Sequence, residues 1–127
     1  MKKISSILLV LYLIACVLTG AIADGLNDSG VKVIGHLLEA LEIGLLLSCW
    51  VVFNLKPRQW AIMFISYMFI RVGLFDYAYN LSSGNDLAHV GTSNLWDRVL
   101  LMIPPHGILF IKSIFLIVGV AIPINEL

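Results

Sequence analysis

The sequence has few charged residues, and none of its polar segments is long enough to form a soluble domain. Eight basic and eight acidic residues make up 13% of its 127 residues, whereas 60% are hydrophobic. A soluble domain of this size needs a polar surface larger than these residues supply. Because the opposite charges cancel, the chain has no broad basic surface for binding nucleic acid.

Motifs that indicate an enzyme are also missing. The sequence contains no P-loop, no GxGxxG fingerprint and no CxxC pair. We therefore expect no cofactor, and an enzyme is the less favoured interpretation. The only two cysteines, Cys16 and Cys49, fall at different depths of the predicted membrane helices. That separation exceeds the ~6 Å between Cα atoms that a disulfide spans, so we expect both thiols to be free.

Four long apolar segments dominate the sequence, at residues 4–23, 32–54, 59–80 and 106–123. Each is close to the ~20 residues that a helix needs to cross a lipid bilayer. The sequence therefore predicts an all-α fold, a polytopic bundle of four transmembrane helices within a single membrane domain, residues 1–127. Residues 93–103 contain Trp96 and Arg98 and stop at Pro104-Pro105, which predicts a short helix at the membrane interface before the last span.

The first segment allows three interpretations. It begins MKKISSILLV, which is typical of bacterial proteins, and Ala21-Ile22-Ala23 would suit signal peptidase. Residues 13–16, LIAC, resemble a bacterial lipobox with Cys16 as the lipidated residue. The apolar run is longer than a ~7–15-residue signal core, which favours a retained span. Cleavage of residues 1–23 would leave three transmembrane helices.

Basic residues predict the orientation of the spans. Lys2 and Lys3 precede the first span, while Lys56 and Arg58 lie in the turn between the second and third spans. Cytoplasmic loops of membrane proteins are enriched in Lys and Arg, so these two regions should be cytoplasmic. We expect a protein of the bacterial inner membrane with both termini in the cytoplasm. Its expected partners are the lipid bilayer and either other membrane subunits or further copies of itself.

The second span contains ionisable residues where a membrane span is usually apolar. His36, Glu39 and Glu42 lie one turn apart along one face of the predicted helix. About a dozen large apolar residues favour its insertion by roughly 6 kcal/mol, whereas two ionised glutamates cost roughly 5 to 7 kcal/mol. The span is therefore marginal alone, and its polar face should contact protein or water.

The third span offers partners for these groups. If the second and third spans form an antiparallel hairpin, residues at equal depth have numbers that sum to about 113. Glu42 is then level with Arg71, and His36 is nearly level with Asp76. On the third helix, Arg71 and Asp76 point in different directions, so we expect neighbours on more than one side of it.

These residues and others form a polar cluster that we expect in the outer half of the membrane. His106 begins the fourth span, and Lys112 lies ~9 Å further in. The predicted cluster comprises His36, Glu39, Glu42, Arg71, Asp76, Tyr77, Asn80, His106 and Lys112.

Three classes of function remain open for this cluster. A paired network of charges would hold helices together in an accessory or assembly subunit of a membrane complex, which is the favoured interpretation. Carboxylates beside histidines and tyrosines would also suit a small proton- or cation-coupled transporter or channel. A metal site formed by His36, Glu39, Asp76 and His106 is the weakest of the three, because such spacing is common by chance.

Overall fold

The computed structural model describes residues 3–91 and 95–126, and it is all-helical over those residues. Five helices follow one another along the chain: α1 (Lys3–Asp28), α2 (Lys32–Val52), α3 (Pro57–Ser83), α4 (Leu95–Leu100) and α5 (Pro105–Glu126). All but α4 are long and apolar enough to cross a membrane. The predicted all-helical bundle with four such helices is therefore confirmed.

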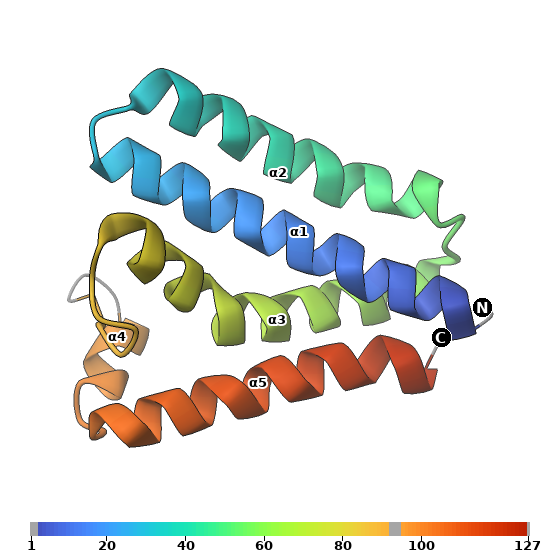
Figure 1. Ribbon diagram of the computed structural model, residues 1–127. Helices are drawn as coiled ribbons and strands as arrows, with labels where there is room; N and C mark the ends of the chain where they lie inside the picture. The colour runs from blue at the N-terminus through green and yellow to red at the C-terminus, as the bar shows by residue number, and fades with distance from the viewer. Residues whose placement is uncertain (1–2, 92–94, 127) are drawn as a thin grey trace.

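The four long helices lie side by side in the order α2, α1, α3, α5 (Figure 1). The central helix α1 packs on α2 and α3 and also touches α5, while α3 packs on α5. Both termini and the α2–α3 turn lie at one end of the bundle, called here the terminal end (Figure 1). The opposite end, called the loop end, carries the α1–α2 turn, residues 84–91 and α4 (Figure 1).

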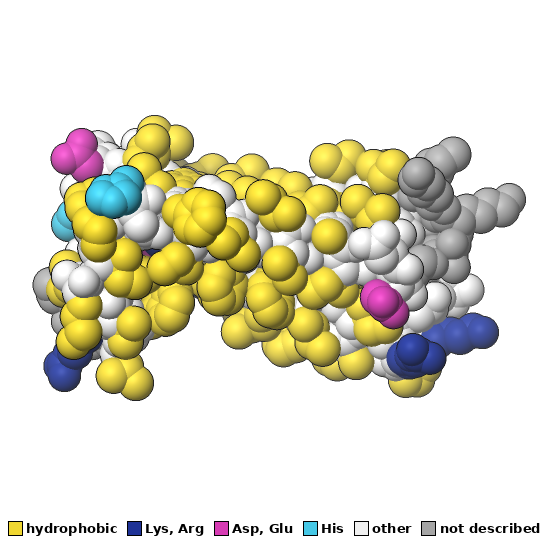
Figure 2. All heavy atoms as spheres, turned by 90° about the horizontal axis from the view of Figure 1, so that it is seen from below, with side chains coloured by type: hydrophobic (Ala, Val, Ile, Leu, Met, Phe, Trp, Pro, Cys, Tyr) yellow, Lys and Arg dark blue, Asp and Glu magenta, His cyan; other side chains and the backbone are white. Residues whose placement is uncertain are grey.

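Apolar side chains cover the long sides of the molecule. Figure 2 shows this on the face seen from below, where charged side chains gather towards the two ends. Large apolar residues are exposed on all four long helices, among them Leu11, Leu47, Ile65 and Ile117. An apolar band between two charged ends is the surface that a bilayer requires of a helical membrane protein.

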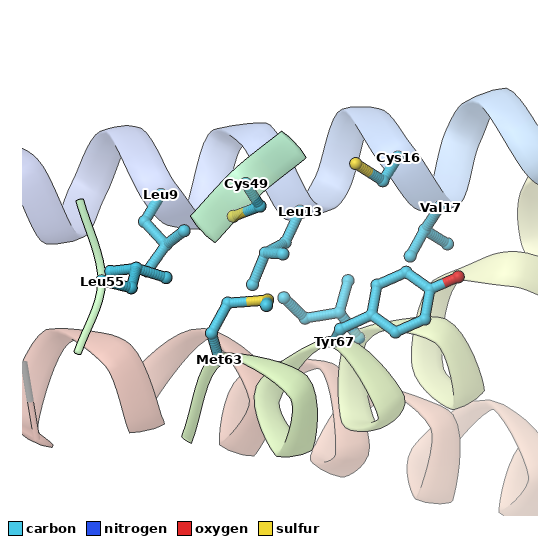
Figure 3. Packing of buried hydrophobic residues seen from close by; sticks show 9 residues of the cluster. Leu9, Leu13, Cys16, Val17, Cys49, Leu55, Met63 and Tyr67 are labelled. Atoms are coloured by element: carbon cyan, nitrogen blue, oxygen red, sulfur yellow. The ribbon is translucent and has the colours of Figure 1, made fainter. Parts of the chain in front are cut away.

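The apolar core fills the half of the bundle nearer the terminal end. Leu9, Leu13 and Val17 of α1 point towards Met63 and Tyr67 of α3 (Figure 3). Cys16 and Cys49 belong to the same buried cluster, and both thiols are free. These side chains come from α1 itself and from α2 and α3, which both pack on it.

Helices α3 and α5 approach each other closely at two glycines. A Cβ atom at Gly73 would lie 2.6 Å from the backbone nitrogen of Leu116. At Gly119, a Cβ atom would lie 2.8 Å from the backbone nitrogen of Ile70. The Ser66 hydroxyl also donates to the Gly119 carbonyl across this contact at 2.5 Å. The small residues allow the two backbones to meet, as in many membrane helix pairs.

Several helix boundaries differ from the predictions by one to five residues, and those of α1 and α4 matter most for the loop end. Helix α1 continues five residues past the predicted end and stops where Gly30 adopts a left-handed φ of 87°. There the Val31 amide donates to the Leu26 carbonyl at 2.9 Å, which closes the helix end. The predicted interfacial helix 93–103 is observed as α4 alone, which ends at Leu100, and residues 93 and 94 lie outside the described residues.

Candidate functional site

A triad of polar side chains lies at mid-length of the bundle. Arg71 of α3 forms an ion pair with Glu42 of α2, with 2.6 Å between Nη1 and Oε1. The Tyr67 hydroxyl donates to the same carboxylate oxygen at 2.7 Å and accepts from Arg71 at 3.0 Å. The Glu42 side chain is only 12% exposed. The central triad, Glu42, Tyr67 and Arg71, thus joins α2 to α3 across the side of α1.

Gly20 of α1 makes room for this triad. A Cβ atom at Gly20 would overlap the carboxylate of Glu42. Because α1 lies between α2 and α3, a larger residue here would push Glu42 away from Arg71. The triad therefore depends on a residue of the first helix as well as on its own three members.

The variant Gly20→Ala tests this dependence. We expect it to lower the free energy of unfolding by about 1–2 kcal/mol, since it overpacks the site and stretches the ion pair. In a Glu42→Ala background, the same substitution should be nearly neutral. The measurement is a double-mutant cycle of unfolding in detergent micelles. Equal costs in both backgrounds would show that Gly20 and Glu42 are not coupled.

A second ion pair joins α3 to α5 nearer the loop end. The Lys112 ammonium lies 2.6 Å from an Asp76 carboxylate oxygen and 5.7 Å from the ring centre of Tyr77. The Lys112 side chain is 0% exposed, whereas that of Asp76 is 35% exposed. The Tyr77 hydroxyl donates to the Leu109 carbonyl at 3.1 Å, which adds a further α3–α5 contact.

The ionisable residues at the start of α2 bond to each other and to α1. His36 Nδ1 lies 3.0 Å from a Glu39 carboxylate oxygen, and the Asn27 amide of α1 donates to the other oxygen at 2.5 Å. Gly35 lets α1 approach here, because a Cβ atom at that position would overlap the Asn27 side chain. His36 remains largely exposed, with 66% of its side chain accessible.

Hydrogen bonds from Asn80 and Tyr79 of α3 stabilise the loop end. The buried Asn80 amide donates to the carbonyls of Leu87 and His89, at 3.2 and 3.0 Å. This holds the chain after α3 against the end of that helix. The Tyr79 hydroxyl donates to Asp28 and so connects α3 to the last turn of α1.

These contacts surround a polar pocket of about 500 Å³ at the loop end, called here the acidic pocket. Among the described residues that line it, five are carboxylates and one is a histidine, and none is a lysine or an arginine. The lining comprises Asp24, Asn27, Asp28, Glu39, Phe75, Asp76, Tyr79, Asn80, His89, Gly91 and Asp97. A concentration of negative charge in a concave surface attracts cations or basic groups of a partner.

The predicted residue pairs are observed in part. Glu42 and Arg71 do meet, as the depth of the two spans predicted. The pairing of His36 with Asp76 is wrong, because His36 contacts Glu39 and Asp76 contacts Lys112. The error comes from the assumed hairpin: α1 lies between α2 and α3, so two residues at equal depth are still separated by a helix. The expectation that α3 has neighbours on more than one side is confirmed.

The structure does not bring all nine cluster residues together. Asn80 and Asp76 line the acidic pocket with Glu39, and Lys112 lies beside Asp76. His106 is exposed at the start of α5, and the described residues include no group of three His, Cys, Asp or Glu side chains placed to hold a metal ion. Of the four candidate metal ligands, His36 contacts Glu39, while Asp76 pairs with Lys112.

Sequence reasoning missed the contribution of the first helix. Gly20, Asp24 and Asn27 lie four and three residues apart, so they share one face of α1. This spacing was visible in the sequence, but the predicted span stopped at residue 23. A polar stripe at the end of an apolar run was the signal that could have revealed the site.

Comparison of the chain with protein-family models, with curated proteins and with solved structures found no match.

Proposed function

We propose that the protein is a small integral membrane protein that serves as an accessory or assembly subunit of a membrane complex. The observation that carries this proposal is the internal pairing of its charges. Glu42 pairs with Arg71 and Asp76 with Lys112, each across two different helices. Groups that are already bonded to one another hold helices in register, which is the task of a scaffold.

The apolar terminal half supports the same proposal. Below the central triad, the described core consists of apolar side chains from α1, α2 and α3 together with the turn residue Leu55. A transport pathway needs polar groups or water along its whole length. Among the described residues, the paired charges and the carboxylates of the acidic pocket lie from the triad to the loop end, whereas the buried polar side chains of the terminal half, such as Ser6 and Ser66, are uncharged.

The orientation proposed for the complex places the terminal end in the cytoplasm of a bacterial cell and the loop end outside. Lys56 and Arg58 lie at the terminal end, the first just before α3 and the second in its first turn. Leu95 and Met102, in and just after α4, are 78% and 85% exposed. These apolar side chains can therefore contact the lipid interface on the outer side of the inner membrane. The acidic pocket would then face the outer side, where we expect it to receive a basic segment of a partner subunit.

Copurification from native membranes tests the proposal. The wild-type chain should retain a partner at fixed stoichiometry, and the double variant Asp24→Asn/Asp28→Asn should lose it. Both carboxylates line the acidic pocket. The control Asp86→Asn removes an exposed acid at the same end that does not line this pocket, and it should keep the partner. Retention by the pocket variant, or a wild-type chain that copurifies with nothing, would contradict the proposal.

The acidic pocket favours one alternative, a small proton- or cation-coupled transporter or channel. Its carboxylates would form the outer vestibule of a pathway, to which α2 contributes Glu39. Such a protein must open a route through the apolar core in a second conformation. Flux into proteoliposomes that Glu39→Gln abolishes would support this alternative, and the accessory-subunit proposal expects no flux.

A further inference from the structure

We propose that the outward face of α2 binds the same face of a second copy of this chain, so that the protein is a dimer with parallel α2 helices at its centre. Helix α2 is an outer helix of the bundle, and among the described helices it packs closely on α1 alone (Figure 1). Its outward face is defined here by His36, Glu39, Ala40, Gly44 and Leu47.

The first argument is an ionisable pair that α2 leaves exposed. The side chains of His36 and Glu39 are 66% and 37% exposed. At 1.5 Å per residue, they lie about 6 and 10 Å inside the start of α2. In a spanning helix, polar side chains at these depths face protein or water rather than lipid. A partner on this face would cover them.

The second argument is that this pair is complementary to itself. Within one chain, His36 Nδ1 bonds to its own Glu39, whose other oxygen accepts from Asn27. The second ring nitrogen of His36 and the remaining lone pairs of the Glu39 carboxylate, one turn apart on the same helix, are the groups that a second copy can bond. When two parallel helices are related by a two-fold axis, a residue near the axis meets its own copy and the residue one turn away. His36 of each copy would therefore meet Glu39 of the other, and the pairing would occur twice. A second copy matches this pattern without requiring a different partner.

The third argument is the close approach that the same face allows. Ala40 and Gly44 are exposed and lie four residues apart, directly below His36 along the helix. A Cβ atom added at Gly44 would meet nothing within 4 Å, so this glycine is not needed for packing inside the chain. Two small residues one turn apart let the backbones of two membrane helices come together.

Glu39 lies on this face and also lines the acidic pocket, but the dimer does not depend on the proposed function, and its test changes Ala40 and Gly44 rather than the pocket residues Asp24 and Asp28. A chain that dimerises through α2 could still fail to bind a partner subunit, and the reverse also holds. The two experiments therefore give separate answers.

Oxidative crosslinking in lipid vesicles tests the dimer directly. The variant Ala40→Cys should form a disulfide-linked dimer rapidly, because its thiol would face its own copy. The control Ser113→Cys places a thiol at similar depth on an exposed position of α5, and it should crosslink at least tenfold more slowly. The wild-type thiols, Cys16 and Cys49, are buried and provide the background. Equal rates for the two variants would overturn the proposal.

The variant Gly44→Leu provides an independent measurement. It should weaken self-association in vesicles at least tenfold, measured by single-molecule photobleaching of labelled protein at several dilutions. The chain should still fold, since the site is open to the outside, and circular dichroism checks this. Phe110→Leu changes a 67% exposed residue on α5 and should leave self-association unchanged. A wild-type chain that stays monomeric at every dilution, or an unaffected Gly44→Leu variant, would contradict the dimer.

Discussion

Replacing Asp76 with asparagine is expected to destabilise the protein far more than replacing Lys112 with methionine. The two residues form one ion pair, but their surroundings differ. Lys112 is completely buried, while the Asp76 side chain is 35% exposed and lines the acidic pocket. The variant Asp76→Asn leaves a buried ammonium without its counter-charge, which costs about 3–5 kcal/mol in known cases.

The opposite variant leaves a charge that water can reach. In Lys112→Met, the Asp76 carboxylate loses its partner but can be solvated from the pocket. Methionine also fills most of the volume of the lysine stem, so we expect a loss of less than about 1.5 kcal/mol. In the double variant Asp76→Asn/Lys112→Met, most of the stability should return, because no buried charge is left.

Unfolding in mixed detergent micelles, followed by circular dichroism, measures all three variants. The control Asp86→Asn removes an exposed acid at the loop end and should have no measurable effect. If Lys112→Met destabilises the protein as much as Asp76→Asn, or if the double variant is less stable than either single variant, the unpaired buried ammonium is not the cause of the destabilisation.

The long elements of this fold followed from the sequence because apolar run length is a local property. Each predicted span overlaps an observed helix, and α2 begins at Lys32 as expected. The equal depth of Glu42 and Arg71 was also predictable, because it follows from the number of residues on either side of the turn between the two helices. What residue counting cannot supply is the order of helices around the bundle.

That order decides which groups meet. Because α1 lies between α2 and α3, Glu42 reaches Arg71 only past Gly20, and His36 cannot reach Asp76. The Asp76–Lys112 pair depends on the tight α3–α5 contact at Gly73, which brings the backbone of Lys112 close. The acidic pocket depends in addition on His89, which lies in the irregular stretch after α3, and on Asp97 of the short helix α4, and neither position follows from the apolar periodicity of a span.

Removal of the first 23 residues is expected to abolish the fold. Helix α1 is the central element of the bundle and supplies fully buried residues such as Leu9, Leu13 and Val17 to the core. Its Tyr12 hydroxyl donates to the Leu45 carbonyl and bonds to the Ser48 hydroxyl, and these hydrogen bonds hold α2 against α1. Without α1, α2 would lose its only extensive packing surface, and Glu39 and Glu42 would face lipid.

A chain expressed without residues 1–23 should therefore be degraded or aggregate in detergent, while the full chain runs as a folded species on size exclusion. The intact mass of the protein from its native membrane should include α1 as well. Ala21 and Ala23 are 0% exposed within α1, so peptidase cleavage there would cut the centre of the bundle. Cys16 is equally buried, and a lipid chain on it would displace Cys49 and its neighbours. A native mass that matches a chain starting after Ala23, or a chain that carries acyl groups on Cys16, would show that the folded bundle is built differently.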